Sequence, residues 1–136
     1  MYCGQDFDVI QPDEIDDFTI DFCNDLSVGE LIESARCRLY VARTSLVNDP
    51  NPMAHLLSPV FVLGTMTTVK VGNNMVDGVL YGIEMQVMTS MNNMISLWSH
   101  IPCQEMDWTG TAWMSGRSQN VHTAHGSNVL SMRRRG

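Results

Sequence analysis

The strongest constraint on the fold of this chain is a run of alternating side chains that follows the turn dipeptide Asp77-Gly78. Small or polar residues at Gly82, Glu84 and Gln86 alternate with apolar ones. Because successive side chains of a β-strand point to opposite faces, this period of two predicts a strand with one buried face. The predicted buried face carries Val79, Tyr81, Ile83, Met85 and Val87.

Tyr81 stands near the start of this predicted strand, shortly after the glycine turn. It resembles the tyrosine corner of immunoglobulin-like and fibronectin-like sandwiches, in which the ring packs beneath a corner and the hydroxyl bonds nearby backbone. We therefore interpret Tyr81 as a candidate structural tyrosine of this type. An ordinary half-buried strand tyrosine is the alternative interpretation.

Further stretches of the chain also have the pattern of strands. The run from Val60 to Thr65 is rich in β-branched residues and apolar on both sides, which is typical of a central strand. Residues 91–94 contain two asparagines, which tolerate positive φ, and they predict a hairpin. The remaining predicted strands span residues 17–23, 34–42, 67–71 and 94–101.

Six or seven short strands, separated by turn residues and without a helix of persuasive length, predict an all-β protein. The expected fold is an immunoglobulin/fibronectin-III-like antiparallel β-sandwich, and a small closed barrel is the alternative. The sandwich domain is predicted over residues 18–103. Residues 1–17 are predicted to form an extended acidic N-terminal arm and residues 104–136 an extended C-terminal arm.

Charge is distributed unevenly along the chain, whose formal net charge is -7. The first 33 residues contain ten Asp or Glu and no Lys or Arg, whereas Arg133, Arg134 and Arg135 lie at the C-terminal end. One interpretation is that both chain ends are solvated and flexible. The other is that both ends dock on oppositely charged surfaces of other subunits. An acidic chain with one short basic cluster is a poor general nucleic-acid binder.

The predicted arms contain apolar residues suited to anchoring on a partner. Phe7 and Ile10 are the candidates at the N-terminal end, and Trp108 and Trp113 at the C-terminal end, together with the three arginines. Tryptophan dominates interface energetics where it fills a pocket. Because Trp108 is close to the last predicted strand, capping of the sandwich within the same chain is the alternative for that residue.

The four cysteines match no zinc signature, because none forms a Cys-x-x-Cys pair. We expect synthesis in a cytoplasm with reduced thiols, since the start of the chain lacks the basic and apolar regions of a signal peptide. A disulfide bond between Cys103 and either Cys23 or Cys37 is an alternative that the sequence leaves open. No stretch approaches the roughly 20 apolar residues of a membrane helix, so no membrane partner is expected.

Few residues suggest catalysis or metal binding. His122 and His125 have helical ligand spacing but lie in a Gly/Ser/Asn-rich stretch without a matching acid, so no metal is expected. His100 and Cys103 are three residues apart and are the candidates for a small hydrolase, although such a pair also needs an oriented base and an oxyanion site. No phosphate-binding loop is present, and no cofactor is expected.

Two stretches carry a family resemblance. The opening Gln11-Pro-Asp-Glu-Ile-Asp-Asp-Phe-Thr-Ile-Asp-Phe22 and the later Asp77-Gly-Val-Leu-Tyr81 resemble motifs of small tailed-bacteriophage virion proteins, described as tail-fibre adaptor or neck-associated components. The resemblance covers about residues 11–101, and Cys23 stands where those proteins often have a tryptophan. It implies an immunoglobulin-like sandwich and a structural, non-enzymatic role.

The resemblance thus leads us to expect a structural protein in the neck or tail of a virion, which connects tail or connector parts to fibres through its arms. Its expected partners are other virion proteins, with self-association in a ring. The alternative is a β-sandwich binding module that recognises a host-surface glycan or protein through its loops, such as residues 48–52.

Overall fold

The structure is a computed structural model that describes residues 1–105 and 129–131. The predictions for Trp108, Trp113 and the arginines at 133–135 lie outside these residues. The described part forms seven strands and one short 3₁₀ helix. In chain order they are β1 (Ile15–Asp21), β2 (Ile32–Val41), η1 (Pro52–His55), β3 (Phe61–Leu63), β4 (Met66–Gly72), β5 (Leu80–Thr89), β6 (Met94–Pro102) and β7 (Val129–Ser131).

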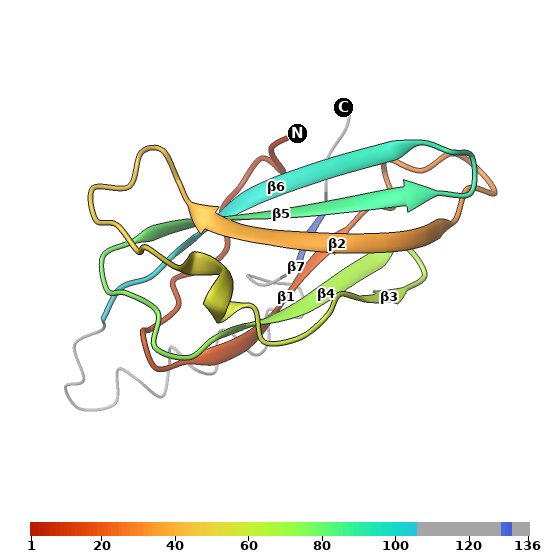
Figure 1. Cartoon of the computed structure of the whole chain (residues 1–136). Coiled ribbons are helices and arrows are strands. Elements are labelled where there is room, and N and C mark those ends of the chain that lie inside the picture. The colour runs from red at the N-terminus through yellow and green to blue at the C-terminus, as the bar shows by residue number, and fades with distance from the viewer. Residues whose placement is uncertain (106–128, 132–136) are drawn as a thin grey trace.

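The strands form two sheets packed face to face, with strand orders β3-β4-β1-β7 and β2-β5-β6 (Figure 1). All neighbours are antiparallel except β7, which runs parallel to β1. The predicted all-β sandwich is confirmed, and two separate sheets exclude the closed barrel. If β1 to β6 are lettered B to G, sheets D-E-B and C-F-G result, the order of a constant-type immunoglobulin sandwich apart from its strand A.

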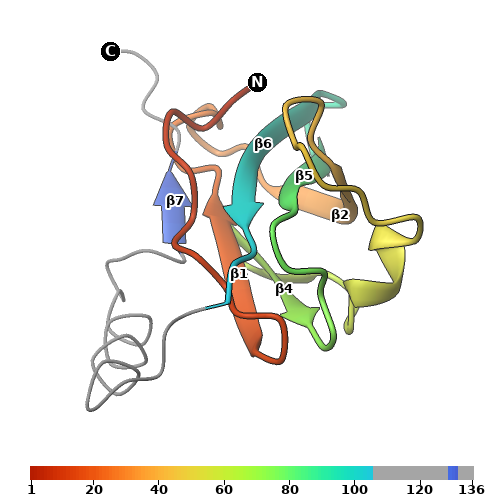
Figure 2. The same ribbon diagram turned by 90° about the vertical axis from the view of Figure 1, so that its left-hand side faces the viewer.

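The first ten residues belong to the sandwich and are not a free arm. The backbone N–H groups of Cys3, Phe7 and Ile10 donate to carbonyls of β6 over 2.8–2.9 Å. The segment therefore runs parallel to β6 and covers its outer edge (Figure 2). The predicted N-terminal arm over residues 1–17 is wrong, because this segment and β1 supply both backbone pairing and core side chains.

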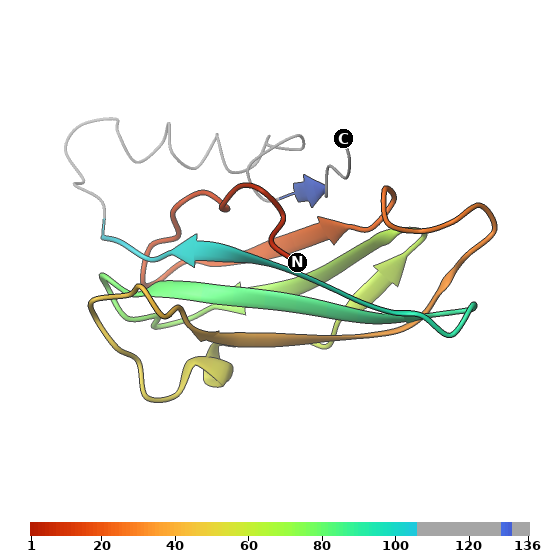
Figure 3. The same ribbon diagram turned by 90° about the horizontal axis from the view of Figure 1, so that it is seen from above.

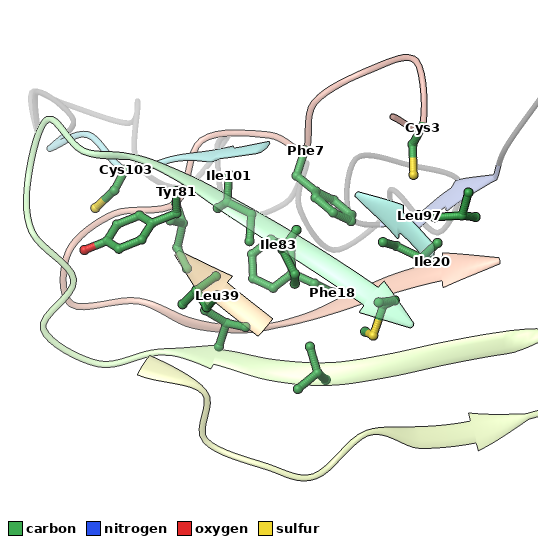
Figure 4. Packing of buried hydrophobic residues seen from close by; sticks show 14 of the residues in the cluster. Cys3, Phe7, Phe18, Ile20, Leu39, Tyr81, Ile83, Leu97, Ile101 and Cys103 are labelled. Atoms are coloured by element: carbon green, nitrogen blue, oxygen red, sulfur yellow. The ribbon is translucent and has the colours of Figure 1, made fainter. Parts of the chain in front are cut away.

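The two N-terminal anchor residues lie inside the protein's own core. Phe7 is 3% exposed and Ile10 is 2% exposed. The Phe7 ring packs edge-on against Phe18 of β1, with 5.0 Å between the ring centroids, in the space between the sheets (Figure 4). The prediction that Phe7 and Ile10 contact a partner is therefore wrong, since burying each already contributes about 1.5–3 kcal/mol to folding.

Alternating side chains of both sheets fill the core, as the sequence pattern predicts. The buried face of β5 carries Tyr81, Ile83, Met85 and Val87, and β1 contributes Phe18 and Ile20 from the opposite sheet (Figure 4). Val79, in the turn before β5, is buried beside them. Figure 3 shows the two layers from above, with the N-terminal segment alongside β6.

The apolar run around residues 60–65 is not a central strand. Its strand, β3, has three residues, pairs only with β4 and forms the edge of its sheet. Pro59 lacks a backbone N–H for a ladder, and Gly64 turns the chain at a φ of 63°. These two residues limit β3 to a short edge strand, and its apolar side chains remain exposed.

Part of the predicted C-terminal arm also returns to the sandwich. Residues 129–131 pair with Thr19, Ile20 and Asp21 as the parallel strand β7. The prediction of an extended arm is therefore wrong for these three residues. The pairing covers the edge of β1 that β4 leaves open.

Candidate functional site

Tyr81 stands at the centre of a buried hydrogen-bond network. Its hydroxyl donates to a carboxylate oxygen of Asp49 over 2.7 Å and accepts from the backbone N–H of Val76 over 2.8 Å. His55 Nε2 lies 2.8 Å from the same Asp49 oxygen. The ring is fully buried near the start of β5. The hydroxyl thus bonds backbone five residues upstream, which is the geometry expected of a structural tyrosine of this type.

The electrostatics of this network fit a structural role. Burial alone would raise the pKa of Asp49, but hydrogen bonds from Tyr81, the Asn51 backbone and His55 outweigh it and lower that pKa. Burial, with the charge of Asp49, raises the pKa of Tyr81. His55 Nδ1 lies 3.0 Å from the Asn73 carbonyl oxygen. Asp49 is thus an ionised acceptor inside the fold, so the carboxylate of the loop 48–52 does not face a ligand.

His100 and Cys103 do not form a thiol–imidazole pair. His100 Nδ1 lies 3.2 Å from the carboxylate of Asp6, beside the ring of Tyr2. Cys103 is buried in the core, and this burial, with the charges of nearby carboxylates, raises its pKa to about 12. Its thiol is therefore protonated at neutral pH and is a poor nucleophile. His100 and Cys103, the two residues on which the hydrolase alternative depends, are therefore not arranged as a catalytic pair.

None of the four cysteines forms a disulfide bond, so neither Cys23 nor Cys37 is bridged to Cys103. Within residues 1–105 and 129–131, no three His, Cys, Asp or Glu side chains gather in a way that could hold a metal ion. His122 and His125 lie outside that range. In the same described part, no helix is long and apolar enough to cross a membrane.

Two surfaces of the sandwich are distinctive, and the first is the outer face of the β2-β5-β6 sheet. Cross-strand register places Arg38, Glu84 and Trp98 in one row and Tyr40, Gly82 and His100 in the next. Tyr2 of the N-terminal segment packs on Trp98 with 4.8 Å between the ring centroids. We call this surface the polar-aromatic face; it consists of Tyr2, Arg36, Arg38, Tyr40, Glu84, Gln86, Trp98 and His100.

Side chains of the polar-aromatic face hold one another in place. The Arg38 guanidinium lies 3.0 Å from a Glu84 oxygen and 4.6 Å from the centroid of the Tyr40 ring. That ring lies across Gly82, where a Cβ atom would come within 2.4 Å of it. A shallow hollow of ≈ 430 Å³ adjoins these residues and is lined by Arg36, Cys37, Arg38, Met53, Glu84 and Gln86.

The second distinctive surface lies along the open side of the other sheet. The stretch that pairs with β4 begins at Leu56, which forms an isolated bridge with Val71. It ends with β3. Phe61 is 60% exposed and Leu63 is 76% exposed on β3. Three further exposed side chains lie on the same stretch or on η1 beside it. We call Met53, Leu57, Phe61, Val62 and Leu63 the apolar edge.

The apolar edge lacks the charged side chains that normally protect an open strand, although β3 is short and follows Pro59. Residues 50–69 contain no Asp, Glu, Lys or Arg, although the whole chain has a formal net charge of -7. Soluble proteins usually place charges or bulges on exposed edge strands, because unpaired backbone groups there invite pairing with another chain. A charge-free apolar edge strand is therefore without the charges that usually prevent pairing with another chain.

Sequence reasoning missed both surfaces. It assigned residues 60–65 to the sheet centre because both faces of the run are apolar, although the absence of charges over residues 50–69 is visible in the sequence. It predicted a strand over residues 34–42 but did not single out Arg36, Arg38 and Tyr40. The register that places Arg38 opposite Glu84, and Glu84 opposite Trp98, is a tertiary feature. No protein-family model and no curated protein matches this chain.

Proposed function

We propose that this chain is a structural assembly protein of a tailed-bacteriophage virion, an adaptor in the neck or tail that joins neighbouring protein subunits. The observation that supports a joining role is the apolar edge. The placement in a virion is supported by the resemblance of residues 11–22 and 77–81 to small tail-fibre adaptor and neck proteins. The mechanism is mechanical and non-enzymatic.

The distribution of covered and open strands favours the joining role. The N-terminal segment covers the outer edge of β6, and β7 covers the edge of β1. Among the described elements, β2 and β3 remain as the outer strands of their sheets. The edge of β2 is partly occupied, because Leu39 N–H donates to the Met53 sulfur over 3.2 Å. The β3 edge is thus the open strand with the most exposed apolar surface.

An open strand edge is suited to joining proteins. A strand from a partner adds to the sheet through main-chain hydrogen bonds, and exposed side chains such as Phe61 and Leu63 supply the apolar contact. Each such contact is small, but the binding strengths of many copies arranged around a tail combine through multivalency. Partners of this adaptor are therefore other virion proteins that present an apolar strand or groove.

The test is complementation of particle assembly. A phage that lacks this chain is supplied with the wild-type protein or with the double variant Phe61→Lys/Leu63→Lys. The matched control is Met91→Lys/Met94→Lys, which adds the same charge at exposed apolar positions of the β5–β6 hairpin. We expect few complete particles from the edge variant and normal numbers from the control. The absence of this chain from purified particles, seen by mass spectrometry, would contradict the proposal.

A second candidate function is recognition of a host-surface glycan or protein by the polar-aromatic face. It is favoured by the aromatic cluster of Tyr2, Trp98 and His100 beside two arginines. Aromatic rings with planar donors such as Arg38 can stack on and bond a polar ligand. A glycan array with the whole chain and with Trp98→Ala distinguishes the two functions, because an adaptor shows no glycan signal.

A further inference from the structure

The free side of β3 is accessible to another strand. On one side, β3 pairs with β4 through Phe61 and Thr68, Val62 and Thr67, and Leu63 and Met66. On its other side no strand of the described chain pairs with it, because β3 is the outermost strand of its sheet. Paired residues share a face, so Phe61 and Leu63 lie on the outer face with Met66 and Thr68.

This short strand is complementary to itself. When two copies of β3 meet antiparallel about Val62, Phe61 of each copy lies opposite Leu63 of the other, and Val62 lies opposite itself. Both cross-strand contacts are then pairs of an aromatic and an aliphatic side chain on the same face, which stabilise antiparallel ladders. A two-fold interface requires this kind of self-complementary patch.

Charge also favours a second copy at this place. Two chains that each carry a formal net charge of -7 repel one another over most of their surface. The run over residues 50–69 contributes no charge to that repulsion. On the same sheet, Lys70 and Asp17 are paired by a contact of 3.0 Å between Nζ and Oδ1, and the Asp21 carboxylate accepts a hydrogen bond from Thr65 Oγ1 over 2.6 Å. The apolar edge itself thus adds no charge at a contact between two identical acidic chains.

We infer that a second copy of this chain docks on the apolar edge, with the two β3 strands antiparallel, so that the β3-β4-β1-β7 sheet continues across a two-fold axis. Three residues per strand form a small contact, so the dimer dissociates at low concentration. The contact closes on itself, and a ring of subunits would need another interface. The inference deepens the joining role proposed above and is independent of the placement in a virion.

Sedimentation velocity of the full chain over a range of concentrations tests this inference. We expect the dimer fraction of the wild type to rise with concentration and to persist in high salt, because the contact is apolar. Phe61→Lys/Leu63→Lys should be monomeric, since the two-fold axis brings lysines of both copies together. Met91→Lys/Met94→Lys, with the same added charge, should dimerise like the wild type. Thermal unfolding shows whether each variant is folded.

A cross-link at the two-fold axis gives a second readout. In a Cys23→Ser background, which removes the exposed native thiol, Val62→Cys should form a covalent dimer on mild oxidation. Leu46→Cys, at a fully exposed position away from β3, should remain mainly monomeric. A monomeric wild type at every concentration, or dimers of Phe61→Lys/Leu63→Lys, overturns the second-copy inference. Loss of particles with that variant would still support the joining role in that case.

Discussion

At the scale of single residues, the fold depends on a few side chains that serve as hydrogen-bond centres. Tyr81 is the clearest case, because its hydroxyl joins Asp49 of a loop to the Val76 backbone of the turn before β5. Its place after a glycine turn is what suggested a structural tyrosine in the sequence. It could not predict Asp49 and His55 as partners, because they lie 32 and 26 positions away along the chain.

Tyr81→Phe should lower the free energy of unfolding by about 1–3 kcal/mol, because it removes a donor to Asp49 and leaves the partly buried backbone N–H of Val76 without this acceptor. Chemical denaturation measures this loss. Tyr40→Phe is the control, since it removes the hydroxyl of a half-exposed ring on the outer face and should change stability little. Equal losses in the two variants would contradict the account.

Asp49 should make folding stability depend on acid pH. Its pKa is lowered in the folded protein, so its contribution is present above the pKa of the unfolded chain and is lost as pH falls through the folded value. Denaturation of the wild type at a series of pH values from 6 to 2 should show a decline in stability. Asp49→Asn should show a smaller decline, and the same slope in both proteins would refute the assignment.

At the scale of elements, alternating patterns predicted β1, β2, β5 and β6 correctly to within a few residues. The predicted hairpin at residues 91–94 is also present, with Asn92 at a φ of 62°. The failures concern position within the sheets. A run of apolar residues has the same sequence pattern in a central strand and in an uncovered edge strand. Likewise, apolar residues before the first strand have the same pattern whether they belong to a free arm or to a segment that pairs with β6.

Phe7→Ala tests the placement of the N-terminal segment. Because the ring packs between the sheets against Phe18, its removal should cost about 3–5 kcal/mol of stability in the isolated chain. Asp8→Ala, at the adjacent exposed position, is the control and should change stability little. If Phe7 instead anchored a partner, the isolated Phe7→Ala chain would unfold at the wild-type denaturant concentration.

Gly72→Ala tests the close approach of β4 to the start of β1. A Cβ atom at this position would lie 2.2 Å from the Glu14 carbonyl oxygen and 2.6 Å from the Ile15 Cα. Gly29 also has a positive φ but open space around it, so Gly29→Ala shares only the conformational strain. Thermal unfolding should show a loss about 1–3 kcal/mol larger for Gly72→Ala. Equal losses would mean that β1 and β4 do not approach this closely.

At the scale of the whole molecule, more of the chain packs on the sandwich than the sequence suggests. The acidic start of the chain completes the core, and residues 129–131 pair with β1, so surfaces of the sandwich itself are the candidate contacts. The alternation of side chains predicted the fold class, because strand periodicity is a local property of the sequence. The apolar edge and the polar-aromatic face depend on which strands lie outermost and on cross-strand register, which no local pattern determines.

Hydrogen–deuterium exchange at the backbone amides of residues 60–64, compared between the dilute free chain and the assembled complex, tests the central claim most directly. We expect rapid exchange in the free chain, because β3 is an uncovered edge, and at least tenfold slower exchange after assembly, when another strand pairs with it. The amides of the β5–β6 hairpin at residues 90–93 provide an internal reference that should not change. Equal exchange of residues 60–64 in both states would show that the apolar edge joins nothing.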